Sequence, residues 1–331
     1  MKKIMLALVF LSGMAAICAF AIVFSLHQSV LHEDATFVVN RGAPMGLVAE
    51  QLGRAGVIRH PLLFIIYARA MRVDRKIKAG EYVFVNGLSA IDVLKKLRTG
   101  DCRLYRITLI EGWTLRQVAD YLSNQPFASS EFASRFISAA ADRYFLRSLG
   151  IIADSAEGYM FPDTYFIPRP VNAEWLIMML ADAFNRAYPP AFDARAGELK
   201  MSRGEIVALA SIIEKEAGND LEKPIVSSVF HNRLRKGIPL QADPTVIYGL
   251  KDFNGNIRKA DLSNSHPYNT YVHKGLPPGP IANPGLLSIK AALWPAETEY
   301  LYFVSRNNGT HEFSKTYTEH AKAVAKYQIG H

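Results

Sequence analysis

The chain has 331 residues, of which 50% are hydrophobic and 21% are charged, so it is long enough for two packed domains and is not a disordered polypeptide. Its formal net charge is +8 at pH 7, but lysine and arginine form no dense stripe, which argues against nucleic-acid binding. The only cysteines are Cys18 and Cys102, which excludes a disulfide scaffold and a cysteine-based metal site.

An apolar run covers residues 4–26 and contains no charged side chain. A helix of about 20 such residues crosses a lipid bilayer, so residues 1–34 are predicted to form a cytoplasmic tip and a single membrane anchor. Lys2 and Lys3 precede the run, and the positive-inside rule then places the rest of the chain outside the inner (cytoplasmic) membrane. The alternative is a cleaved signal peptide with an A-x-A site at residues 19–21, although the run exceeds the ~7–15 residues of a usual signal core.

A strand, a turn and a helix are predicted within residues 37–52, and the same order recurs within residues 107–122. In the first copy, a second apolar helix and a closing strand follow. Such units resemble LysM modules, which bind N-acetylglucosamine polymers, and residues 35–105 are assigned to a LysM-like domain. The alternative role is a spacer that holds the remaining domain, residues 106–331, away from the membrane.

Two helices of the C-terminal region have clear end signals. Ser130 is predicted to cap one helix that runs to Leu149. Ser202 and Glu205 form an S-x-x-E capping box, which starts a second helix that ends before Gly218.

Two glutamates lie on the apolar side of this second helix. At roughly 100° per residue, Glu214 and Glu216 fall inside the apolar arc but about 160° apart, so they should face different surroundings. One interpretation is that one of them has a raised pKa and acts as a general acid at neutral pH. The other is that each pairs with an arginine or a backbone donor and stabilises the fold. The spacing does not choose between the two glutamates.

Other catalytic classes are disfavoured by spacing. His231, His266 and His273, with Glu216, lack the spacing of a zinc hydrolase, so no metal and no cofactor are expected. Ser211 lies within a predicted helix and has no G-x-S-x-G elbow around it, which argues against a serine esterase.

The residues around the two glutamates carry a resemblance to a known family. The run L-A-S-I-I-E-K-E at 209–216 resembles the signature of the endolytic murein transglycosylases of the MltG (YceG-like) type. Further matching motifs are E-G at 157–158, F-P-D-T-Y at 161–165, Q-A-D-P-T-V-I-Y-G at 241–249, P-Y-N-T-Y at 267–271, G-L-P-P-G-P-I at 275–281 and N-P-G at 283–285. With the apolar N-terminus and the LysM-like unit, the resemblance covers nearly the whole chain.

The resemblance implies an enzyme that cleaves the β-1,4 bond between N-acetylmuramic acid and N-acetylglucosamine inside peptidoglycan strands. The new end is a 1,6-anhydromuramoyl sugar, so the reaction is that of a lyase. In this family the catalytic acid is the first glutamate of the E-K-E run, a role that carries over to Glu214. The expected partners are peptidoglycan strands, the lipid bilayer through residues 4–26, and cell-wall synthases near which nascent strands are terminated.

This chemistry needs one carboxylic acid, because the C6 hydroxyl of the sugar attacks in place of water. The same group can protonate the leaving oxygen and then take the proton of the attacking hydroxyl. Neutral donors and aromatic side chains must position the sugars, although each is also a common turn or core residue. The candidates for substrate binding are Gln241, Asp243, Thr245, Tyr248, Tyr268, Asn269, Thr270, Tyr271 and Glu216.

Two other functions stay open. One is a glycoside hydrolase with the same substrate, in which Asp243 is the second carboxylate. The other is a membrane-anchored, glycan-binding scaffold without turnover. In all three cases the predicted architecture is α+β, with one N-terminal transmembrane helix, a small LysM-like α+β unit and a mixed α+β catalytic domain.

Overall fold

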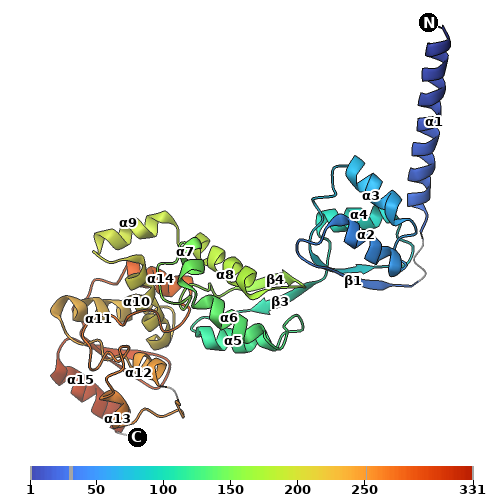
Figure 1. Cartoon of the computed structure of the whole chain (residues 1–331). Helices are drawn as coiled ribbons and strands as arrows, with labels where there is room; N and C mark the ends of the chain where they lie inside the picture. The colour runs from blue at the N-terminus through green and yellow to red at the C-terminus, as the bar shows by residue number, and fades with distance from the viewer. Residues whose placement is uncertain (1, 30–32, 251, 330–331) are drawn as a thin grey trace. The chain divides into compact units, whose positions relative to one another are not determined.

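The computed structural model describes residues 2–29, 33–250 and 252–329 (Figure 1). Its fold is α+β, as predicted. Within the described residues, helices alternate with six short strands, which pair as three two-stranded sheets, β1–β2, β3–β4 and β5–β6.

Two compact units make up the chain. Unit 1 contains residues 1–107 and a short returning segment, residues 165–171. Unit 2 contains residues 108–164 and 172–331. The matching motifs lie in unit 2, except that the motif at 161–165 ends with the first residue of the returning segment of unit 1.

The first helix, α1 (Lys2–His27), covers the apolar N-terminal run. Phe10, Ile17 and Phe20 are among its exposed side chains. Across the part of the chain that the structure describes, no helix is long and apolar enough to cross a membrane.

Unit 1 follows the predicted strand–helix–helix–strand order. β1 (Ala35–Val39) pairs antiparallel with β2 (Gly80–Phe84), and α2 (Met45–Arg54) and α3 (Pro61–Ala70) connect them. A further helix, α4 (Ala90–Thr99), follows β2 and is absent from the sequence-based description.

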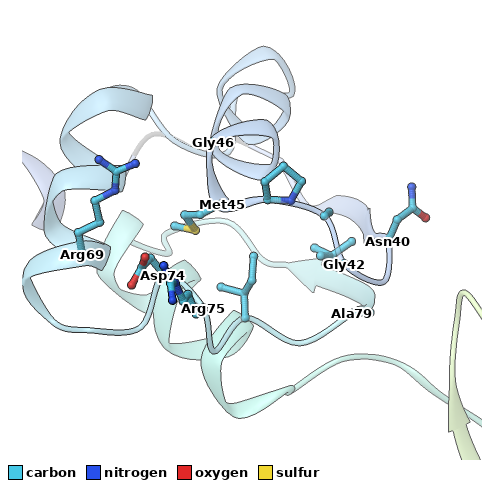
Figure 2. A pocket seen from close by; sticks show the side chains of 12 residues that line it. Asn40, Gly42, Met45, Gly46, Arg69, Asp74, Arg75 and Ala79 are labelled. Carbon is cyan, nitrogen blue, oxygen red and sulfur yellow. The ribbon is translucent and has the colours of Figure 1, made fainter.

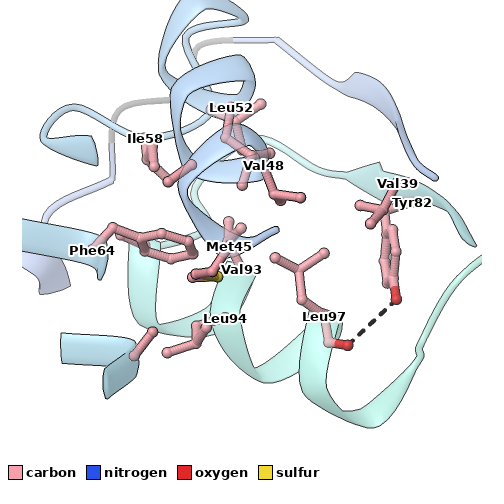
Figure 3. Close-up of a cluster of buried hydrophobic side chains, with 14 of the residues drawn as sticks. Val39, Met45, Val48, Leu52, Ile58, Phe64, Tyr82, Val93, Leu94 and Leu97 are labelled. Carbon is pink, nitrogen blue, oxygen red and sulfur yellow. Dashed lines mark hydrogen bonds between the residues drawn. The ribbon is translucent and has the colours of Figure 1, made fainter. Parts of the chain in front are cut away.

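The core of unit 1 forms because its helices and its sheet turn their apolar faces toward one another (Figure 3). Leu52 of α2, Phe64 of α3 and Leu97 of α4 are fully buried there. Tyr82 of β2 is also fully buried, and its hydroxyl donates to the carbonyl oxygens of Lys78 (2.7 Å) and Leu97 (3.4 Å). The aromatic ring is therefore removed from water without leaving its polar group unpaired.

The predicted repeat is present in the backbone. β3 (Leu104–Thr108) and α5 (Leu115–Ser123) repeat the strand–turn–helix order of β1 and α2. The turn of each copy contains a glycine with positive φ, 72° at Gly42 and 77° at Gly112. Glycine adopts this conformation without steric cost, which explains its place at both turns.

The single helix predicted between residues 130 and 149 is wrong. The structure has two helices here, α6 (Phe132–Ala140) and α7 (Arg143–Ser148). Asp142 lies between them, and its carboxylate accepts hydrogen bonds from two backbone N–H groups of α7, at 2.9 and 3.1 Å. An aspartate cap satisfies the free donors of a first helical turn, and here it starts a new helix.

The remaining elements of unit 2 include helices before and after the predicted capping box, with two short strands near the C-terminus. β4 (Thr164–Pro168), which pairs with β3, lies almost entirely in the returning segment of unit 1. The elements of unit 2 that follow it in the chain are α8 (Ala173–Ala187), α9 (Pro190–Glu198), α10 (Arg203–Glu216), α11 (Lys223–Lys236), α12 (Asp243–Gly249), α13 (Lys259–Leu262), α14 (Leu286–Leu293), β5 (Tyr302–Ser305), β6 (His311–Ser314), α15 (Tyr317–Val324) and a π-helical turn (Ala325–Ile329).

Helix α10 is the buried centre of unit 2. It begins at the predicted capping box, in which the Ser202 hydroxyl accepts from the Glu205 N–H and the Glu205 carboxylate accepts from the Ser202 N–H. Residues 206–213 are all buried, and α11 and α14 pack against the helix. Glu214 and Glu216 lie in its last turn, so both candidate acids are attached to a rigid element.

Candidate active site

Glu214 is held by two partners. Its Oε1 lies 3.2 Å from Nζ of Lys223 on α11, and its Oε2 accepts a hydrogen bond from the N–H of Gly285 at 2.8 Å. The side chains of Glu214 and Lys223 are only 8% and 4% exposed. Both partners suit a negatively charged carboxylate, so Glu214 joins α10 to α11 and to the loop before α14.

A second carboxylate, Glu111, lies beside this ion pair. Burial raises the pKa of Glu111, the charge of Glu214 raises it further, and the ammonium of Lys223 lowers it. Gly285 makes room for this side chain, because a Cβ at Gly285 would overlap a carboxylate oxygen of Glu111. Glu111, which the sequence assigns only to a turn, therefore belongs to the charged cluster around Glu214.

Glu216 has a different environment. It lines a polar cavity of about 230 Å³ at the end of α10. Burial and, to a smaller extent, the negative charge of Asp243 raise the pKa of its carboxyl group to about 8, although the positive charge of Arg233 opposes the shift. At neutral pH the carboxyl group therefore carries its proton, next to a space that can receive a ligand.

The positive charge of this cavity comes from Arg233, whose guanidinium is held in place by main-chain carbonyl groups. Arg233 of α11 donates through Nε to the carbonyl oxygen of Leu301 (2.7 Å) and through Nη1 to that of Leu240 (2.9 Å). Its guanidinium also lies over the ring of Tyr302, 5.2 Å from the centroid. Among the described residues Arg233 forms no ion pair with a carboxylate, so its charge remains available to the cavity.

Three of the predicted substrate-binding residues reach the same cavity, namely Gln241, Asp243 and Tyr271. The Tyr271 hydroxyl donates to Oδ1 of Asp243 at 2.6 Å, and Nη1 of Arg233 donates to Oε1 of Gln241 at 3.3 Å. Gln241 has a φ of 51°, a left-handed conformation that is uncommon outside glycine. Its N–H donates to the carbonyl oxygen of Thr270 (3.0 Å), which holds this strained turn at the rim of the cavity.

Three other predicted residues hold the loops together instead of lining the cavity. Thr245 and Thr270 are fully buried, and their hydroxyl oxygens lie 2.8 Å apart. Asn269 is buried as well, and its side-chain amide donates to backbone carbonyl oxygens, with the shortest bond, 2.7 Å, to Asn264. The contact between the two threonines connects α12 to the 267–271 segment and thereby positions Asp243 opposite Tyr271, while Asn269 holds the same segment to Asn264.

Tyr248 and Tyr268 form a separate aromatic pair, with ring centroids 4.8 Å apart. The Tyr248 hydroxyl donates to Glu157 (3.1 Å), a buried carboxylate that also accepts from the N–H of Leu115. Burial raises the pKa of Glu157 to about 7, although these hydrogen bonds lower it. Tyr268 also lines a second cavity of unit 2, of about 350 Å³, next to residues 277–280 and the start of α10.

Unit 1 has a cavity of its own, of about 420 Å³ (Figure 2). It lies between the turn after β1, which contributes Asn40 and Gly42, and the segment before β2. Arg69, Asp74 and Arg75 supply charged groups to its lining. Polar and apolar surface are therefore both available to a ligand here.

The histidines considered for a metal site have other contacts. His231 Nε2 lies 2.8 Å from the carbonyl oxygen of Ala292, and His273 Nε2 lies 3.2 Å from that of Ser265. His266 packs against the ring of Tyr268. Within the residues that the structure describes, no group of three or more His, Cys, Asp or Glu side chains could hold a metal ion.

The cavity of Glu216 also contains side chains that the sequence analysis does not name, Arg233, Phe303 and His320. Helical spacing offers a signal for Arg233, because it follows Val226 and Phe230 on the buried face of α11, where an arginine is out of place unless it has a role. No local signal identifies Phe303 and His320. Both come from C-terminal elements that only tertiary packing brings to α10.

Comparisons with known proteins agree with the motifs. The model of the YceG-like family matches residues 37–326. The endolytic murein transglycosylase of Bacillus subtilis (strain 168) is 32% identical over 317 residues, which cover 90% of this chain and 87% of that protein. That of Streptococcus pneumoniae serotype 2 (strain D39) is 29% identical over 322 residues, and the match spans 87% of this chain but 58% of the relative.

A crystal structure of a YceG-like protein from Listeria monocytogenes is similar as well, with 32% identity and a TM-score of 0.60. The match covers 88% of this chain and 99% of that structure. The family model, the relatives and the fold all extend over most of the sequence. The chain therefore belongs to the YceG-like family.

Proposed function

We propose that this chain is an endolytic murein transglycosylase, which cuts peptidoglycan strands between N-acetylmuramic acid and N-acetylglucosamine. Membership of the YceG-like family and the names of its relatives support the reaction. The observation that carries the proposal is the carboxyl group of Glu216, whose pKa of about 8 keeps it protonated beside a polar cavity. A protonated acid next to an open, polar space suits the general acid that glycosidic cleavage requires.

In the proposed reaction Glu216 gives its proton to the glycosidic oxygen, and the bond from that oxygen to the anomeric carbon of N-acetylmuramic acid breaks. The C6 hydroxyl of the same sugar forms a new bond to the anomeric carbon and returns its proton to Glu216. No water is consumed, and the product is a 1,6-anhydro ring. Because the attack is intramolecular, the protein needs to orient the sugar but need not bind a separate nucleophile.

Glu216 is proposed for this role in preference to Glu214, to which the family resemblance alone leads. Glu214 is engaged by Lys223 and by the N–H of Gly285, and both of its oxygens therefore have partners. Glu216 shares its cavity with Asp243, whose negative charge favours the protonated form of Glu216 and can stabilise a developing oxocarbenium ion. In this proposal Glu214 positions the end of α10 and does not take part in proton transfer.

A two-carboxylate hydrolase is the second candidate, because Asp243 and Glu216 line one cavity. In that case Asp243 would activate water, and cleavage would leave a reducing sugar. Digestion of purified peptidoglycan followed by mass spectrometry separates the two reactions. We expect 1,6-anhydro ends from the wild type and no new ends from Glu216→Gln. Reducing ends alone would identify a hydrolase, and intact strands would favour the non-catalytic scaffold.

We also propose that unit 1 is a LysM-like module that holds the glycan in its cavity of about 420 Å³. Its strand–helix–helix–strand order and the mixed lining of the cavity support this role. Arg69→Ala with Asp74→Ala is expected to weaken the retention of the protein on insoluble peptidoglycan. If this double variant is retained on peptidoglycan as well as the wild type, the spacer role is favoured.

The N-terminal anchor is a proposal that rests on residues 4–26, which have no charged side chain, and on Lys2 and Lys3 before them. We expect the full chain to stay in the membrane pellet after an alkaline carbonate wash, and a chain without residues 1–27 to be soluble. Protection of unit 2 from protease in intact spheroplasts would contradict its proposed place outside the inner membrane. The expected contact with cell-wall synthases stays a prediction.

A further inference from the structure

The C-terminal helix α15 brings a histidine to the cavity of Glu216. The helix begins with a capping box, in which the Thr316 hydroxyl accepts from the N–H of Glu319. His320 lies in its next position and lines the cavity together with Glu216, Asp243 and other residues. None of the matching sequence motifs includes His320, and it has no role in the proposed reaction.

The imidazole of His320 is held by stacking. Its ring lies 5.1 Å from that of Tyr302, with an angle of 20° between the two planes. The same tyrosine ring is contacted by the guanidinium of Arg233. The side chain is therefore anchored through its face, which fixes the ring orientation and leaves its nitrogen atoms to other partners.

The two nitrogen atoms of this ring differ. Nδ1 is buried and has no hydrogen-bond partner. Nε2 is not among the buried unpartnered atoms, no hydrogen bond from it to another described residue is present, and the side chain lines the cavity. Burial lowers the pKa of His320 and the charge of Arg233 lowers it further, so the ring is neutral at pH 7. The single proton of a neutral ring is better placed on Nε2, where water or a ligand can accept it.

Two other donors of the cavity are engaged with the protein. The guanidinium of Arg233 donates to main-chain carbonyl groups and to Gln241, and the hydroxyl of Tyr271 donates to Asp243. Asp243 offers carboxylate acceptors for sugar hydroxyls, and the side-chain NH2 of Gln241 is a second neutral donor in the cavity. The amide carbonyl of an N-acetyl group is an acceptor only, and it needs a neutral donor that is not spent on the protein.

We propose that His320 is a substrate-binding residue, whose Nε2–H donates a hydrogen bond to the carbonyl oxygen of a sugar N-acetyl group in the Glu216 cavity. This inference rests on the proposed function, since it takes the occupant of the cavity to be an N-acetylated glycan. It assigns the recognition of the N-acetyl group to a residue that reaches the site from the C-terminus of the chain.

Two substitutions separate the donor from the stacking. His320→Gln places an amide N–H near the position of Nε2 but removes the ring, whereas His320→Phe keeps the ring against Tyr302 and removes both nitrogen atoms. We expect His320→Phe to raise KM on glycan strands roughly fivefold to tenfold, the value of one neutral hydrogen bond, with a smaller change in kcat. His320→Gln is expected to stay within about twofold of the wild type. Thr318→Ala, on the exposed side of α15, is the matched control.

Calorimetric titration tests recognition without turnover. Chitotetraose and cellotetraose, which lacks the N-acetyl group, are the two probes. All variants, including the reference called wild type here, also carry Arg69→Ala and Asp74→Ala, so that binding by unit 1 does not contribute to the preference. The wild type should prefer chitotetraose, and His320→Phe should lose most of that preference while its thermal midpoint is unchanged. If His320→Phe keeps the preference, or if His320→Gln loses it while His320→Phe does not, the inference is wrong. A wild type that binds chitotetraose but leaves strands uncut would reject the proposed function and still test His320.

Discussion

Two glutamates at the end of one helix have opposite surroundings in this protein. Glu214 faces an ammonium and a backbone N–H, while Glu216 faces a cavity and the negative charge of Asp243. A separation of two residues is enough to give the two side chains different environments, because two helical positions turn them far apart around the helix axis. Burial of an acid is therefore not by itself a sign of catalysis. What matters is whether the buried group is paired or is left with its proton beside open space.

The largest expected effect comes from removing each acid in turn. Glu216→Gln should reduce the rate of strand cleavage by roughly 10²–10⁴-fold, which is the usual contribution of a general acid–base group. Glu214→Gln should cost stability first and change the cleavage rate of the folded protein much less. Single-turnover cleavage of purified glycan strands measures both. A full loss in Glu214→Gln, with Glu216→Gln active, would return the catalytic role to Glu214.

The ion pair of Glu214 can be broken from its other side. Lys223→Met leaves Glu214 buried without its ammonium, and we expect the free energy of unfolding to fall by about 3–5 kcal/mol. The exposed Lys236 at the end of the same helix is the control, and Lys236→Met should stay within about 0.5 kcal/mol. Urea denaturation followed by circular dichroism provides the measurement. Equal stability of the two variants would show that the pair does not hold α10 to α11.

The pH dependence of cleavage tests the protonation state of Glu216 and its coupling to Asp243. Glu216 must be protonated to act as an acid, so activity should fall as pH rises through its pKa of about 8. Asp243→Asn removes a negative charge that raises this pKa, and the alkaline limb of kcat/KM should therefore move to lower pH. Asp182→Asn, at an exposed position of α8, should leave the profile unchanged. A limb that stays in place in Asp243→Asn would contradict the coupling between the two carboxyl groups.

The smallest effect is expected at the rim of the cavity. Tyr271→Phe removes the hydroxyl that donates to Asp243 at 2.6 Å. Because Asp243 is exposed, water can replace this donor, and we expect a loss of roughly 0.5–1.5 kcal/mol in stability with only a few-fold change in rate. Thermal unfolding and initial rates measure the two effects. A rate loss as large as that of Glu216→Gln would mean that the tyrosine hydroxyl takes part in the chemistry.

Local sequence was sufficient for several elements of the fold. The capping box of Ser202 and Glu205 starts α10 as predicted, because its hydrogen bonds involve residues three positions apart. The recurrence of Gly42 and Gly112 marked two strand–turn–helix units for a similar reason. The helix predicted between residues 130 and 149 was wrong because the cap at Asp142 competes with the continuation of the helix, and periodicity does not reveal that competition.

The candidate site was predictable in part. The motif containing Gln241 and Asp243 reaches the cavity of Glu216, as does Tyr271 from another motif. The same motifs contain three buried residues whose hydrogen bonds hold the loops together, namely Thr245, Asn269 and Thr270. A short motif contains residues that contact ligand and residues that support them, and both kinds are polar.

By itself the sequence determined the α+β class, the family signature and the presence of two glutamates on the apolar side of one helix. These features depend on periodicity, caps and spacing, which act over a few residues. Only the tertiary structure decided which glutamate is paired and which retains a proton, because Lys223, Gly285, Arg233 and Asp243 come from separate elements. Electrostatic interactions depend on distance in space, and distance in space between such residues follows from packing and not from their order in the chain.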